Sequence, residues 1–93
     1  MAETVRPEVR VFARLMEERL KANDHKGGWK KCTFSYLVAR LLQEVNDELI
    51  PALLERDQVL PSTSIKVAKE AADVANFAMM IADRAYSGKR ETS

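Results

Sequence analysis

The sequence predicts an all-α protein: a helical bundle that forms one domain and is completed by oligomerisation. Aliphatic residues recur at helical spacing through three segments, and no stretch shows the polar–apolar alternation of a half-buried strand. The chain is 46% hydrophobic and contains only 3 Gly and 3 Pro, which favours an ordered, helix-rich fold over disorder. We therefore expect residues 1–93 to form a single domain.

The first predicted helix covers residues 7–22 and is followed by a loop. Pro7 suits the first helical position, where its missing N–H would have no partner. The apolar residues of this segment recur on one face: Val9, Phe12, Leu15, Met16 and Leu20. Gly27 and Gly28 interrupt the pattern, so we expect a loop over residues 23–32.

The second predicted helix covers residues 33–50 and has the clearest periodicity in the chain. Thr33 is placed to cap its first turn. Its apolar residues follow the i, i+3, i+4, i+7 rule: Phe34, Leu37, Val38, Leu41, Leu42, Val45 and Leu49. Pro51 is expected to end or bend this helix, with a short continuation over residues 52–56. A connection is expected over residues 59–64.

The third predicted helix covers residues 65–86, with Gly88 as its C-terminal stop. Its stretch from Val74 to Ala82 is apolar on nearly every side. A helix that is apolar all round must be buried all round, and one 93-residue subunit offers too few neighbours for that. We therefore expect a homodimer or homotetramer.

Charge and cysteine content exclude several classes of protein. The 15 basic and 14 acidic side chains give a net charge of +1, so we expect no nucleic-acid partner, which would usually require a clustered basic surface. Cys32 is the single cysteine, and a reducing, cytoplasmic location is the default expectation. Glu3, Arg6 and Glu8 interrupt the N-terminal apolar residues, which predicts neither a signal peptide nor a membrane span.

Two groups of acidic residues stand out on the second and third predicted helices. Glu44, Asp47 and Glu48 are three and four residues apart, and Glu70 and Asp73 are one turn apart among Val and Ala residues. Carboxylates at the edge of a buried seam repel one another and lose hydration unless a counter-charge is present. A bound Mg²⁺ or Mn²⁺ would supply that charge, because hard cations prefer oxygen ligands.

Alternatives to this interpretation come from the same residues. The acidic pairs are also compatible with ordinary solvated faces, in which case the protein would be a non-catalytic helical oligomerisation or interaction module. Di-iron proteins with carboxylate ligands in a helical bundle use Glu-x-x-His pairs. His25 is the single histidine and lies in the predicted loop, so iron is not expected.

From Ser35 to Asp83 the chain resembles the MazG-like superfamily of all-α nucleoside triphosphate pyrophosphohydrolases. The first family motif, a Glu-x-x-Glu within a helix, is matched by LQEVNDEL at residues 42–49. Glu44 and Asp47 match its two metal ligands, with Asp in place of the second Glu. Gln43 stands where relatives are often acidic, and Glu48 is a nearby substitute ligand if Asp47 is too short to reach.

The second family motif, Glu-x-x-Asp, is matched by Glu70 to Asp73. Its surroundings, VAKEAADV at residues 67–74, are similar to the branch that contains phosphoribosyl-ATP pyrophosphohydrolase. In length the chain resembles small phage members, including the MazZ type linked to purine deoxynucleotides. The resemblance covers about half of the chain, and the order and spacing of the two motifs carry more weight than either motif alone.

This resemblance implies hydrolysis of a (deoxy)nucleoside triphosphate to the monophosphate and pyrophosphate, assisted by Mg²⁺ or Mn²⁺. It implies catalytic roles for Glu44, Glu70 and Asp73, and adds Asp47 and Glu48 as candidate metal ligands. The expected substrate is a purine deoxynucleotide such as dGTP, the alternative being a pyrimidine or damaged nucleotide. It also implies the bundle type of that superfamily.

Candidate substrate-binding residues lie in the loop and on the third helix. They are His25, Lys26, Trp29, Lys30, Lys31 and Asn76. The lysines could bind phosphates as point charges, Trp29 offers a flat surface for a base, and Asn76 is a polar residue on an apolar helix that needs partners if buried. The alternatives are a solvated loop, a packing role for Trp29 and a structural hydrogen bond for Asn76.

Overall fold

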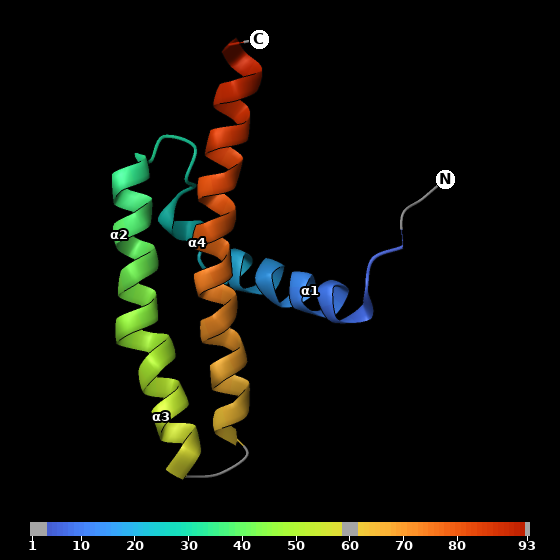
Figure 1. The fold of residues 1–93 in the computed structure, drawn as a ribbon, viewed down its shortest axis with the longest axis vertical. Helices are drawn as coiled ribbons and strands as arrows, with labels where there is room; N and C mark the ends of the chain where they lie inside the picture. The colour runs from blue at the N-terminus through green and yellow to red at the C-terminus, as the bar shows by residue number, and fades with distance from the viewer. Residues whose placement is uncertain (1–3, 59–61, 93) are drawn as a thin grey trace.

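The computed structural model describes the backbone of residues 4–58 and 62–92, and the side chains of residues 4–55 and 64–87. Every regular element in these ranges is helical: α1 (Pro7–Ala22), the 3₁₀ turn η1 (Asp24–Lys26), α2 (Phe34–Glu44), the π-helical turn η2 (Val45–Leu49), α3 (Ile50–Gln58) and α4 (Ser62–Thr92). Figure 1 shows α2 and α3 as one column beside α4, while α1 crosses α4. The all-α prediction is confirmed.

Helix α1 has the predicted bounds, and its end leads into the loop that borders the site. Its last turn is held by Asn23, whose Nδ2 donates to the backbone oxygen of Arg19 at 2.9 Å. The 3₁₀ turn η1 follows at once, so part of the predicted loop is ordered. Gly27 then adopts φ 90°, a left-handed conformation that favours glycine. This turn directs the chain from α1 towards the start of α2.

The second helix begins as predicted, and the expected helical continuation beyond Pro51 is present and extends to Gln58. The Oγ1 atom of Thr33 accepts a hydrogen bond from the Tyr36 N–H at 3.1 Å, which caps the first turn. The chain then stays helical through Gln58, because the hydrogen-bonding pattern changes from α-helical to π-helical in η2, shortly before the proline. There the Ile50 N–H donates to the Val45 oxygen, five residues back. The wider turn accommodates a ring that would clash in a regular α-helix.

Helix α4 is longer than predicted at both ends. Residues 62–64, expected in the connection, are helical, and residues 59–61 lie outside the described part of the chain. The prediction that Gly88 stops the helix is wrong, since α4 continues to Thr92. A glycine inside a helix costs only about 1 kcal/mol relative to alanine, and the residues on both sides of Gly88 remain helical.

The core of one chain is small. Among the described side chains, the buried hydrophobic ones are Leu37, Ala52 and Ala72, which are 1%, 1% and 0% exposed. Large aliphatic side chains on α2, α3 and α4 remain exposed, among them Val38, Leu42, Leu54 and Ile65. Despite this apolar surface, no helix in the described ranges combines the length and apolarity needed to cross a membrane. Oligomerisation would cover part of this apolar surface and stays a prediction.

Replacing Ala78 with glutamate tests that prediction. Ala78 lies within the apolar stretch of α4 and is exposed in the single chain, so the charge should be harmless in a monomer. In an oligomer that buries this stretch, Ala78→Glu should dissociate the protein into monomers, because an unpaired charge would be desolvated. Light scattering at micromolar concentration measures the change. Ala13→Glu, on an exposed position of α1, is the matched control. A wild-type protein that is already monomeric would contradict the prediction.

Candidate metal and nucleotide site

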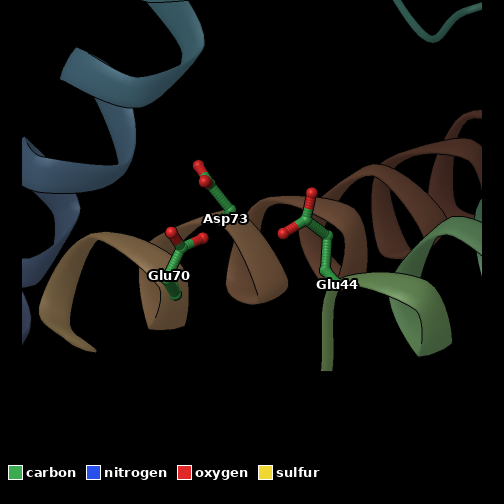
Figure 2. A group of neighbouring side chains, drawn as sticks. All are labelled: Glu44, Glu70 and Asp73. Atoms are coloured by element: carbon green, nitrogen blue, oxygen red, sulfur yellow. The ribbon is translucent and has the colours of Figure 1, made fainter. Parts of the chain in front are cut away.

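Three carboxylates from two helices converge beside α1. Glu44 is the last residue of α2, and Glu70 and Asp73 lie one turn apart on α4. One oxygen atom from each residue lies within 4.8 Å of the others. Figure 2 shows the Glu44 side chain reaching from its own helix towards the other two. The packing of α2 against α4 therefore brings Glu44 of the first predicted acidic group to both members of the second.

The electrostatics of this cluster favour uptake of positive charge. Burial raises the pKa of Glu44 above its ordinary value of 4.5, and the nearby charge of Asp73 raises it further. Burial likewise raises the pKa of Glu70, again followed by the effect of Asp73. The Oε2 atom of Glu44 is buried and has no hydrogen-bond partner. A buried carboxylate oxygen without a donor is costly, and a cation or a proton would satisfy it.

The geometry of the cluster fits a hard divalent cation. All the candidate ligand atoms are carboxylate oxygens, which Mg²⁺ and Mn²⁺ prefer. Adjacent ligands of an octahedral Mg²⁺ are about 3 Å apart, so oxygens within 4.8 Å of one another would have to draw closer together around the ion. Glu44, Glu70 and Asp73 are the residues that would hold the ion.

Two arginines that sequence analysis did not single out flank the carboxylates. Arg19 of α1 donates through Nε to Asp73 Oδ1 at 3.0 Å and through a terminal nitrogen to Oδ2 at 2.9 Å. Its bond to Asp73 raises the pKa of Arg19 further above its ordinary value. Arg40 of α2 lies 3.6 Å from a Glu44 oxygen, and its guanidinium stacks 4.9 Å from the centre of the Phe77 ring.

A sequence signal for both arginines existed. Arg19 falls three and four residues after Met16 and Leu15, on the apolar stripe of its helix. Arg40 falls between Leu37 and Glu44 on the same face of α2. A charged residue on an apolar stripe needs a partner, but the sequence does not indicate which acid that partner is.

The carboxylates open onto a cavity of about 370 Å³ between α1, the loop, α2 and α4. This volume lies within the range of small-molecule sites. Its polar wall comprises Glu44, Glu48, Glu70, Asp73, Arg19, Arg40 and Lys26, and its less polar wall includes Trp29, Leu37, Phe77 and Met80. The cavity is therefore lined by both charged side chains and aromatic or aliphatic ones, and the two kinds meet where Arg40 stacks on Phe77.

The resemblance described above spans all three converging carboxylates. No protein-family model, curated protein or solved structure matches this chain. Membership of the MazG-like superfamily stays a prediction from the residues at 42–49 and 67–74.

Asp47 and Glu48 are placed differently by η2. Glu48 lines the cavity, and its charge contributes to the raised pKa of both Glu44 and Glu70. Asp47 is exposed and is not among the cavity-lining residues. Neither carboxylate belongs to the three-residue cluster. The residue that matches the second ligand of the family motif, Asp47, thus lies outside the cavity wall, whereas its neighbour Glu48 lies in it.

The loop residues divide between the cavity and the outer surface. Lys26 and Trp29 line the cavity, whereas His25 and Lys31 are exposed and do not. The Trp29 indole N–H donates to Asp83 Oδ2 at 3.0 Å, and the Lys30 ammonium lies 2.6 Å from that oxygen. The same ammonium is 5.4 Å from the centre of the Trp29 ring. Lys30 thus neutralises Asp83 and lies over the indole ring.

Asn76 is buried, 3% exposed, and lines the cavity one turn beyond Asp73. Its Nδ2 donates to the backbone oxygen of Met16 at 3.0 Å, which ties α4 to α1. Its Oδ1 has no partner. Asn76 therefore makes the structural hydrogen bond that was one of its two predicted roles. Its contact with a substrate stays a prediction.

Proposed function

We propose that this protein is a metal-dependent nucleotide pyrophosphohydrolase that converts a (deoxy)nucleoside triphosphate to the monophosphate and pyrophosphate. The observation that carries the proposal is the convergence of Glu44, Glu70 and Asp73 in a cavity that aromatic side chains also line. The motif resemblance supports it independently, because it assigns catalytic roles to these same three residues. A purine deoxynucleotide such as dGTP is the first substrate to test.

The chain's own residues would divide the work along the cavity. Arg40 and Lys26 are cavity-lining cations that would attract the phosphates. Trp29 would face the base, using the side of its ring that Lys30 does not cover. When bound, Mg²⁺ or Mn²⁺ would neutralise charge on the phosphates and favour ionisation of a water.

The reaction requires a base as well as a cation site. A water attacks the α-phosphorus, the bond from that phosphorus to the bridging oxygen breaks, and pyrophosphate leaves. The base must be a carboxylate oxygen that the cation does not occupy. The Oε2 atom of Glu44 is buried and unpartnered, so Glu44 would hold the ion through one oxygen and accept the proton of the water with the other.

The products of a single turnover test the proposal. With Mg²⁺ or Mn²⁺ and a panel of nucleotides, we expect pyrophosphate and a monophosphate as the first products. In ¹⁸O-labelled water the label should enter the monophosphate, because the attack is on the α-phosphorus. Initial release of orthophosphate, or no turnover of any nucleotide, would contradict the proposal and favour the helical interaction module.

Replacing Trp29 tests the placement of the base. Trp29→Ala should weaken binding of the preferred nucleotide by about 1–3 kcal/mol, the usual value of one aromatic stacking contact, and should change the ranking among bases. Trp29→Phe keeps a flat ring while losing the hydrogen bond to Asp83, so it should retain the ranking. KM values across the nucleotide panel measure the effect. Lys31→Ala, outside the cavity wall, is the control, and an unaltered ranking in Trp29→Ala would make Trp29 a packing residue.

A further inference from the structure

The Arg19–Asp73 ion pair occupies the same carboxylate that a cation would bind. Both oxygens of Asp73 accept a hydrogen bond from the Arg19 guanidinium, at 3.0 and 2.9 Å. This paired geometry is the stronger form of arginine–carboxylate contact. The two side chains are 29% and 15% exposed, so solvent screens the pair only partly. Arg19 therefore supplies Asp73 with the positive charge that a divalent ion would otherwise provide.

The charge balance of the cavity changes when a cation enters. Glu44, Glu48, Glu70 and Asp73 are the acidic groups in the cavity wall, and Arg19, Arg40 and Lys26 are its basic groups. A divalent ion next to Asp73 would repel the Arg19 guanidinium and compete for the same oxygen lone pairs. Once released from Asp73, the guanidinium would lie beside the ion with its donors unpaired. A phosphate group can accept hydrogen bonds from two nitrogens of the guanidinium at once and would be its new partner.

The surrounding contacts allow the side chain to move without moving its helix. The Arg19 backbone oxygen is held by Asn23, and α1 is tied to α4 through the hydrogen bond from Asn76 to Met16. Among the described residues, Arg19 donates both of its side-chain hydrogen bonds to Asp73, while Glu70 and Glu44 act on it through their charge. Arg40 is more constrained, since its guanidinium also stacks on Phe77 and donates to Gln43.

We propose that Arg19 is an exchangeable counter-ion: it neutralises Asp73 when no divalent cation is bound, and it transfers to a phosphate oxygen of the ligand once the cation takes Asp73. This inference rests on the proposed function, because it assumes a divalent ion and a polyphosphate in the same cavity. Its consequence is an ordered site, in which the cation binds first and creates an additional anion-binding group. Arg19 acts in this scheme as a positioning and binding residue.

Titration of the metal-free protein with Mn²⁺ alone tests the first half of the proposal. Arg19→Gln should bind Mn²⁺ about tenfold more tightly than wild type, because the competing charge is gone. Arg19→Lys, which keeps the charge but cannot form the paired contact, should fall between the two. Arg14→Gln removes the same charge from an exposed position of α1 and should leave the affinity unchanged. Circular dichroism confirms that each variant is folded.

Binding of inorganic pyrophosphate at saturating Mn²⁺ tests the second half. Arg19→Gln should weaken this binding about tenfold, so that its effects on the cation and on the anion have opposite signs. Equal or weaker Mn²⁺ binding in Arg19→Gln would overturn the counter-ion role, and unchanged pyrophosphate binding would overturn the transfer. Neither measurement needs turnover. A protein that shows both effects but hydrolyses no nucleotide would support the exchange while refuting the proposed function.

Discussion

Replacing Glu44 with glutamine is expected to lower kcat/KM for the triphosphate at least about a hundredfold, the usual effect of losing a general base, while the protein becomes more stable. The substitution keeps the volume of the side chain and removes a charge that burial and Asp73 disfavour. Glu70→Gln should behave in the same way, because burial and Asp73 also raise the pKa of that group. Steady-state kinetics and thermal melting without metal measure the two effects.

Asp47→Asn is the matched control for this prediction. Asp47 lies one turn after Glu44 on the same helical column, but it is exposed and does not line the cavity. Its conversion to an amide should therefore leave most of the activity. Loss of activity in Asp47→Asn comparable to that in Glu44→Gln would show that the family motif places the second ligand better than the geometry does. Full activity in Glu44→Gln would remove Glu44 from the site.

The gain in stability has a defined pH dependence. The folded-state pKa of Glu44 is raised, so its contribution to stability is fully present below the ordinary pKa and is lost as pH rises through the raised value. The melting temperature of Glu44→Gln should therefore exceed that of wild type near neutral pH. The difference should shrink as the pH falls towards the ordinary value of 4.5. A difference that grows on acidification would contradict the assignment of burial as the cause.

Truncating Leu37 to alanine is expected to cost about 2–5 kcal/mol of the free energy of unfolding. Among the described side chains, Leu37 is the largest that is almost completely buried, at 1% exposed. It lies on α2, the helix that packs against α4. Small domains have about 5–15 kcal/mol of stability in total, so this single change would remove a large share. Urea unfolding followed by circular dichroism measures it through the shift in midpoint.

Leu42→Ala provides the same chemical deletion on the same helix. Leu42 is 54% exposed in the single chain, so in a monomer the substitution should change stability by about 0.5 kcal/mol or less. A large loss at Leu42 that depends on protein concentration would indicate that a second copy covers this face, as the oligomer prediction requires. A Leu37→Ala protein as stable as wild type would contradict the burial of Leu37.

Local patterns account for most of the fold. Pro7 and the apolar periodicity of residues 7–22 correctly predict α1, and Thr33 correctly predicts the start of α2, because capping and periodicity involve residues within one or two turns. The errors also have local causes. The helix continues beyond Pro51 as expected, but the π-helical turn η2 before the proline was not predicted. Gly88 was expected to stop a helix that continues through it, because one glycine costs a helix only about 1 kcal/mol.

The sequence by itself determined the acidic residues of the candidate site: spacing and resemblance identify Glu44, Glu70 and Asp73. Only the tertiary structure decided that these three converge, that Glu48 rather than Asp47 faces the cavity, and that Arg19 and Arg40 are their counter-ions. Arg19 and Asp73 are 54 residues apart in the chain. Spacing along the sequence gives the direction in which a side chain leaves its helix. Which side chain of another helix it meets depends on how α1, α2 and α4 pack together.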